Sequence, residues 1–315
     1  MNKLFSLLIV LVLSVTLANA QVVFTFTNCG ATGINGPTQG DINTAYSGTT
    51  LDGAVTINTQ GIQEWTVPAD GDYSIQAFGG QGGRTKDTGE EYRGPGADIY
   101  GEFTLTAGQT IKVVVGQEGV PNTSGNMANG GGAGGGGSFI WVDGQSLPLI
   151  VAGGGGGGSI INTSYNLENC KGVGGAITND GLPSNSGVAN YGTNGGDGTQ
   201  GVFALGWNTM FGGSNFIGKT GNYNQEAGFG GGGCHADYAH GGGGGGGYSA
   251  GGNGQYGYNS GQGNADGRNG GGGGGSYNAG INQVNTPGAN SGQGYVVITQ
   301  LCDPINIVVD PGTTV

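Results

Sequence analysis

The seven residues from Cys234 to His240 carry the groups best suited to metal chemistry. They contain both histidines of the chain, His235 and His240, together with Asp237 and Cys234. Imidazole, thiolate and carboxylate groups are the usual zinc ligands, and a coordinating Cys234 would have to be a thiolate. A disulfide at Cys234 competes with that role and would leave three ligands. We therefore expect no metal and no cofactor, and interpret this segment as a polar loop that caps the glycine-rich region.

A second stretch matches the phosphate loop of nucleotide-binding proteins. Residues Gly213 to Thr220 fit its glycine and Lys-Thr pattern, and Phe139 to Asp143 resembles the strand that holds the magnesium ion of such sites. The motif requires a helix directly after it, with the helix N-terminus facing the phosphates. Gly221 to Asn224 contains no helix start. We expect no nucleotide binding and no enzyme activity, since no nucleophile elbow supports a Ser-His-Asp triad either.

The N-terminus has the pattern of a secretory signal peptide. Lys3 precedes an apolar run from Leu4 to Leu17, and the small-residue cleavage motif Ala18-Asn19-Ala20 follows. The run is shorter than the ~20 apolar residues of a membrane-spanning helix, and the sequence has no second candidate span. We predict a signal peptide over residues 1–20, a mature chain that begins at Gln21 without a membrane span, and a secreted, extracellular or cell-surface location.

Export would place the four cysteines in an oxidising compartment. All of them lie in the predicted mature part: Cys29, Cys170, Cys234 and Cys302. Two disulfides are expected, and the spacing of four cysteines leaves all three connectivities open.

The composition excludes several classes of protein. The 315 residues include 79 glycines, only 9% of residues are charged, and the net charge is −12. No strict Gly-X-Y repeat is present, so the chain is not a collagen. Eight scattered lysines and arginines form no basic patch, so we expect no binding to nucleic acid.

Strand-like segments dominate the chain up to residue 152. Most alternate apolar and polar side chains, as strands with one buried face do. The expected strands are Val22–Thr27, Tyr73–Phe78, Ile99–Leu105, Thr110–Val115, Phe139–Val142, Leu147–Val151 and, near the end, Tyr295–Thr299. Asp143-Gly144 is expected to make a tight hairpin turn. The sandwich strands therefore lie mainly in residues 22–152 and 295–300.

Five glycine tracts occupy much of the remaining chain. They span residues 130–137, 153–158, 230–233, 241–247 and 270–275. Ordering a residue costs about 1–2 kcal/mol of backbone entropy, and glycine loses the most. The tracts are either disordered spacers or extended rods with three residues per turn that pack side by side. The aromatic residues among them favour the rods, whose ends and edges those residues would plug. We predict a bundle mainly over residues 130–137 and 153–294, with structural glycines at Gly134, Gly155, Gly231, Gly244 and Gly272.

Several motifs follow one another in a distinctive order. They include Phe26-Thr27-Asn28-Cys29-Gly30, Gly61 to Ala69, Gly101 to Leu105, Val114 to Gly119, Gly134 to Val142, Pro148 to Ala152 and Phe229 to Cys234. This order resembles the extracellular glycine-rich domain of the anaplastic lymphoma kinase and leukocyte tyrosine kinase receptor family. The resemblance covers roughly Phe24 to Cys302.

The resemblance implies an all-β fold: a jelly-roll, tumour necrosis factor-like sandwich with an inserted polyglycine II helix bundle. It also implies a ligand-binding role. The family has a second cysteine where this chain has Ile42, so we predict that Cys29 pairs with Cys302 and Cys170 with Cys234. The kinase signatures His-Arg-Asp and Asp-Phe-Gly do not occur in the sequence.

We therefore expect a non-catalytic extracellular recognition module over residues 21–302. Its partner would be an extracellular protein ligand or a cell-surface or glycan target. The alternative is a structural or adhesive surface or matrix protein with a rigid glycine-rich scaffold. Residues 303–315 are interpreted as a tail or as the start of a further domain.

Overall fold

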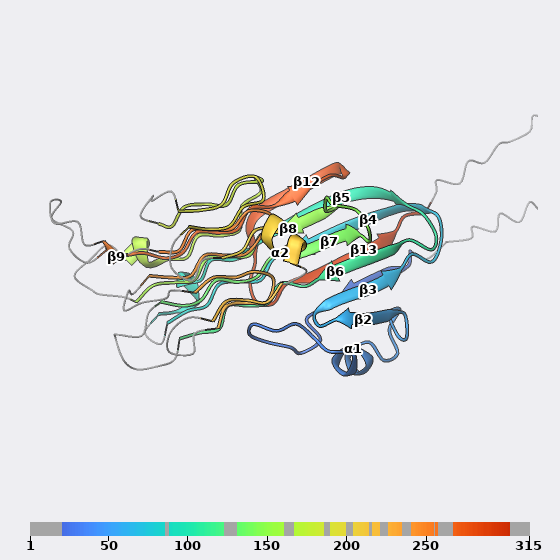
Figure 1. Cartoon of the computed structure of the whole chain (residues 1–315), viewed down its shortest axis with the longest axis horizontal. Helices are drawn as coiled ribbons and strands as arrows, with labels where there is room; N and C mark the ends of the chain where they lie inside the picture. Colours follow the sequence, from blue (N-terminus) through green and yellow to red (C-terminus); the bar gives the residue numbers. More distant parts are fainter. Residues whose placement is uncertain are drawn as a thin grey trace, which may run out of the picture.

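The computed structural model describes residues 21–85, 88–122, 131–160, 167–185, 190–199, 204–213, 216–220, 226–234, 241–254, 256–257 and 267–302. Two antiparallel sheets fill one half of the elongated molecule. The glycine-rich segments run side by side through the other half (Figure 1).

The first sheet has five strands in the order β1-β13-β4-β5-β12. Their bounds are β1 Val23–Phe26, β4 Gly71–Phe78, β5 Gly96–Leu105, β12 Ile281–Asn290 and β13 Tyr295–Gln300. Strands β1 and β13 come from opposite ends of the chain and pair with Val23 opposite Thr299. The last described strand, β13, therefore lies inside the sheet, between β1 and β4.

The second sheet has six strands in the order β11-β8-β7-β6-β3-β2. Their bounds are β2 Val55–Thr59, β3 Ile62–Thr66, β6 Thr110–Val114, β7 Ser138–Val142, β8 Ile150–Ala152 and β11 Tyr277–Asn278. A separate two-stranded ladder joins β9 (Tyr256–Gly257) to β10 (Gly267–Arg268). This arrangement confirms a mostly β, sandwich-like fold.

Helices in the described residues are short. Helix α1 (Gln39–Ala45) begins at a capping box, in which the Thr38 side chain and the Asp41 carboxylate satisfy each other's backbone N–H groups. Helix α2 spans Trp207–Gly213, and two 3₁₀ turns span Glu90–Tyr92 (η1) and Leu167–Cys170 (η2). Ile42 is buried on α1 against the sandwich core.

The core lies between the two sheets. Apolar side chains from both inner faces form one cluster, in which Trp65 of the six-stranded sheet contacts Phe24, Phe26 and Tyr73 of the other at ring distances of 4.7–6.3 Å. The buried Gln63 is satisfied, because its amide donates to the Thr27 carbonyl and it accepts from the Tyr46 hydroxyl. The alternation expected from the sequence thus produces a two-layer core.

The side of the six-stranded sheet that points away from the core is covered by residues of the glycine-rich half. Phe139 and Trp141 of β7 pack against Trp207 of α2 and against Phe216, at ring distances of 5.1–6.0 Å. Phe229 belongs to the same buried cluster. Trp207, Phe216 and Phe229 were expected to plug the ends and edges of the glycine bundle; the structure shows that they cover a sheet face.

The tract of residues 153–158 shows how the glycine-rich segments pack. The N–H groups of Gly154 and Gly157 donate to the tract of residues 241–247, and those of Gly155 and Gly158 donate to residues 80–83. Its carbonyls accept from the N–H groups of residues 94, 97, 132, 135, 271 and 274. The partner changes with a period of three residues, so one tract bonds to neighbours all around it and its backbone groups are satisfied without a regular sheet.

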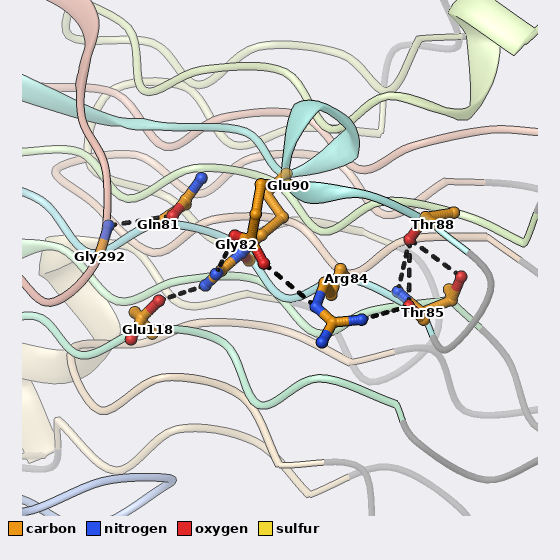
Figure 2. A network of polar contacts seen from close by, with 9 residues as sticks. Gln81, Gly82, Arg84, Thr85, Thr88, Glu90, Glu118 and Gly292 are labelled. Atoms are coloured by element: carbon orange, nitrogen blue, oxygen red, sulfur yellow. Dashed lines mark hydrogen bonds and ion pairs between the residues drawn. The ribbon is translucent and has the colours of Figure 1, made fainter.

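A buried arginine and several amide groups connect the segments that leave the two sheets. The Arg93 guanidinium donates to the Gly82 carbonyl at 2.7 Å and forms ion pairs with Glu90, at 2.7 Å, and with Glu118. Figure 2 shows the surrounding network, in which Gln81 binds the backbone of Gly292. Since Arg93 has a side chain only 9% exposed, this network fixes the segments that leave the sheets.

Two local expectations are corrected. Strand β8 begins at Ile150 and not at Leu147, which is exposed. The Asp143-Gly144 turn exists, with Gly144 at φ +80° and the Gln145 N–H bonded to the Val142 carbonyl, but it belongs to a longer connection. Strands β2, β3 and β12 and helix α1 were not expected.

Candidate functional site

The solvent-facing side of the five-stranded sheet is the most distinctive surface in the described part of the chain. We call it the outer face and define it by the outward side chains of the five strands: Val23, Thr25, Asp72, Ser74, Gln76, Phe78, Asp98, Tyr100, Glu102, Thr104, Val284, Thr286, Tyr295, Val297 and Thr299. In β1, β4, β5 and β13 the alternating residues point into the core. The strand alternation therefore makes one face from both polar and apolar residues.

Strand register aligns these residues in rows. Thr25 lies opposite Val297, Val297 opposite Gln76, Gln76 opposite Tyr100, and Tyr100 opposite Val284. Directly paired residues of an antiparallel sheet share a face, with Cβ atoms about 4.5–5.5 Å apart. A continuous row thus crosses all five strands, with aliphatic, aromatic and amide side chains next to one another.

A second row carries the aromatic pair of the outer face. Tyr295 lies opposite Phe78, and Phe78 lies opposite Asp98. The two rings stack at a centroid distance of 4.0 Å and an interplanar angle of 18°. Burial raises the pKa of Tyr295, and the neighbouring Asp98 carboxylate adds to the rise. Both groups therefore lie in a partly desolvated environment.

The carboxylates of the outer face are held by neutral donors. Gln76 donates to both carboxylate oxygens of Asp98, at 2.9 and 3.1 Å. Tyr100 donates to Glu102 at 3.0 Å, and Asn282 donates to the other oxygen of Glu102 at 2.7 Å. Burial raises the pKa of Asp98 despite the Gln76 bond. Because the five strands contain no lysine or arginine, these carboxylates have no cationic partner within the sheet.

The edge of the same sheet exposes large aliphatic side chains. Ile281 is 69% exposed and Val284 62%, the highest values among the large apolar residues that the structure describes. On the opposite edge Val23 is 41% exposed. The outer face therefore combines exposed aliphatic groups, half-buried aromatic rings and unpaired negative charge. A surface of this kind suits a partner with apolar and positively charged groups.

The predicted structural glycines lie where side chains do not fit. A Cβ atom on Gly134, Gly155, Gly244 or Gly272 would overlap a backbone carbonyl of a neighbouring segment. Gly231 differs, because its φ is +84° and a Cβ there would meet the Met210 sulfur atom at 2.5 Å, next to the aromatic cluster. The first four glycines are thus in packed tracts, and the fifth is in a turn.

The cysteines are not brought together as expected. No disulfide bond joins them in the part of the chain that the structure describes. Cys29 follows the Phe26–Val296 end of the β1–β13 pair and Cys302 follows the opposite end, beyond Gln300. At about 3.3 Å per residue the paired strands hold these ends roughly 13 Å apart, whereas a disulfide needs Cα atoms within about 7 Å. The predicted Cys29–Cys302 bond is not present among the described residues.

The other predicted pair has different contacts for each thiol. Cys170 donates to the Ile160 carbonyl at 3.7 Å, and Cys234 donates to the Lys219 carbonyl at 3.1 Å. Burial raises the pKa of the Cys29 thiol.

The candidate metal ligands and the phosphate-loop motif are only partly described by the structure. Of the proposed metal ligands, Cys234 is buried beside Ala133 and Ala227, whereas His235, Asp237 and His240 lie outside the described residues. In the phosphate-loop motif, helix α2 ends at the first glycine, Gly213. Lys219 forms backbone hydrogen bonds to Gly232 and Ala227, and Thr220 forms a β-bridge with Glu226. The described part of this motif therefore lacks the geometry of a phosphate site.

Comparison with known proteins finds a distant and partial likeness. The leukocyte tyrosine kinase receptor of Mus musculus is 36% identical to this chain over 98 residues. The aligned stretch is 30% of this chain and 11% of the receptor, so the chain matches about a tenth of that relative's length. No family model matches the chain. No helix in the described residues is long and apolar enough to cross a membrane, and no kinase domain is evident in the sequence.

Proposed function

We propose that this chain is a non-catalytic extracellular recognition module that binds a protein ligand through the outer face of its five-stranded sheet. The observation that carries the proposal is the composition of that face. Exposed Val284, half-buried Tyr100 and the carboxylates of Asp98 and Glu102 lie side by side without a cation in the sheet. The ligand would present basic and aliphatic side chains, since these complement both properties of the face.

The glycine-rich half would serve as a rigid support. We propose that its tracts are polyglycine II helices inserted into a jelly-roll sandwich. The three-residue period of the hydrogen bonds around residues 153–158 supports this interpretation. A support that is already ordered lowers the entropy lost on binding.

The location proposed for the module is extracellular. Its support is the signal-peptide pattern of residues 1–20 and the partial similarity to a receptor tyrosine kinase. The recognition domain would span residues 21–302. Secretion of the full chain from eukaryotic cells, with Gln21 at the N-terminus of the secreted product, is the expected result.

Surface plasmon resonance separates recognition from adhesion. The secreted chain would be immobilised and exposed to a panel of small recombinant extracellular proteins and, separately, to a glycan array. A recognition module should give saturable one-to-one binding to one protein or a few related ones, weakened by salt because charge contributes. Broad binding to glycans or bare surfaces that does not saturate would favour the adhesive alternative.

A further inference from the structure

The segment from Gly33 to Pro37 is held through its carbonyl groups. Its five successive carbonyls accept hydrogen bonds from the Phe229, Gly218 and Gly61 amides and from the Gln117 and Gln60 side chains, at 2.8–3.1 Å. By contrast, no hydrogen bond from the Gly36 N–H occurs among the described residues. Gly36 is buried and Asn35 before it is exposed. A buried N–H without a partner is rare in folded proteins.

The other described Asn-Gly steps differ at this same atom. The Gly195 amide donates to the Ser249 hydroxyl at 2.9 Å, the Gly254 amide to the Gly242 carbonyl at 2.8 Å, and the Gly270 amide to the Asn169 carbonyl at 2.8 Å. In each of these steps the glycine N–H is engaged in a hydrogen bond, which must break before the nitrogen can lose its proton and attack. The N–H that follows Asn35 has no such bond to the part of the chain that the structure describes.

We propose that Asn35-Gly36 is a site of spontaneous backbone modification. After hydroxide removes its proton, the Gly36 nitrogen attacks Cγ of Asn35, and the bond from Cγ to Nδ2 breaks with release of ammonia. The product is a five-membered succinimide. Water then adds to either imide carbonyl and opens the ring, which leaves aspartate or isoaspartate at position 35. Glycine favours the attack because it has no side chain to hinder the approach.

The modification would lie where the Gly33–Pro37 segment packs against Gly61, which precedes β3, and against Phe229. Gly36 lies so close to Gly61 and the Phe229 ring that a Cβ atom at position 36 would overlap both. Isoaspartate would lengthen the backbone by one methylene group here and add a negative charge. The carbonyls of Gly33 and Ile34, which bind the amides of Phe229 and Gly218, would shift with it.

Peptide mapping by mass spectrometry tests the proposal. The intact, folded chain would be incubated in mildly alkaline buffer, and deamidation would be followed at Asn35, Asn194, Asn253 and Asn269. We expect Asn35 to react at least about tenfold faster than each of the others, which corresponds to a barrier lower by about 1.4 kcal/mol. In urea the four rates should converge, because the hydrogen bonds that distinguish them are lost.

Two variants complete the experiment. Asn35→Gln should abolish the early loss of ammonia and the early labelling by protein isoaspartate methyltransferase in the peptide that contains residue 35, because glutamine cyclises far more slowly. Asn194→Gln, at a step with a bonded glycine amide, should leave both signals unchanged. A folded-state rate at Asn35 within about threefold of the other three sites, a ratio worth under 1 kcal/mol, would overturn the proposal.

Discussion

Replacing Gly155 by alanine tests whether the glycine tracts are close-packed. Gly155 lies in the middle of the tract of residues 153–158, and a methyl group there would overlap the carbonyl carbon and oxygen of Gly94 and lie 2.8 Å from the Pro95 oxygen. All three atoms belong to backbone, so no side-chain rotation can make room. The neighbouring segment must move or the tract must bend.

The expected loss of stability is about 3 kcal/mol. Forcing one methyl group into a packed interior costs roughly 1–3 kcal/mol. Movement of these segments also strains two hydrogen bonds, from the Gly94 N–H to the Gly156 carbonyl and from the Gly155 N–H to the Gly80 carbonyl. Both are 2.9 Å long, and each contributes about 1 kcal/mol. The smaller entropy of the unfolded chain with alanine returns about 0.4–1 kcal/mol.

Urea unfolding followed by tryptophan fluorescence measures this loss. Trp65 reports on the sandwich core and Trp207 on the covered sheet face. The matched control is Gly40→Ala, because Gly40 is exposed on α1 and the nearest atom to its added methyl would be the Thr38 hydroxyl at 3.7 Å. That change should be neutral or stabilising by up to about 1 kcal/mol. A loss below about 0.5 kcal/mol for Gly155→Ala would refute close packing of the tract.

Three further predictions concern the Arg93 network and the aromatic residues that cover the six-stranded sheet. Arg93→Met should destabilise the chain by about 3 kcal/mol in the same urea assay, since it leaves Glu118 without its buried partner. Arg84→Met, which removes the more exposed ion pair with Glu90, should cost under about 1 kcal/mol. Equal losses of stability in the two variants would contradict the role given to Arg93. Hydrogen bonding to Arg93 lowers the pKa of Glu90 below its ordinary value of 4.5, so its stabilising effect is present above that pH and is lost as the pH falls; the stability difference between wild type and Glu90→Gln should shrink through this range, and a constant difference would argue against the ion pair. Phe216→Ala should cost about 3–5 kcal/mol and shift tryptophan emission to the red, because the 2% exposed ring packs on Trp141 at 5.5 Å; an unchanged spectrum would mean that the face is not covered.

Strands with alternating residues could be predicted from the sequence. The expected segments Tyr73–Phe78 and Tyr295–Thr299 agree with β4 and β13 to within two residues. Strand β12 could not be predicted from the sequence. Its ten residues include Pro287, Gly288 and four Asn or Gln residues, which have low strand propensity. It is a strand because β5 pairs with it.

The candidate site depends on register, which the sequence does not show. Tyr100 and Val284 are far apart in the chain and lie opposite each other only because β12 pairs with β5. The same limit applies to the predicted pairing of Cys29 with Cys302. Both cysteines follow strands that pair with each other, but the antiparallel direction places them at opposite ends. For the strands that were expected, the alternation of side chains indicated one buried face; which residues become neighbours on the other face was not predictable.

A charge placed on the outer face tests the central claim most directly. Val284→Lys puts a cation beside Tyr100 at a 62% exposed position, so the fold should be unaffected. For a protein ligand found by surface plasmon resonance, we expect this variant to weaken binding by at least about tenfold, or 1.4 kcal/mol. Thr56→Lys, at an exposed position on β2 of the other sheet, should bind as wild type does. Equal affinities of the two folded variants would contradict recognition through the outer face.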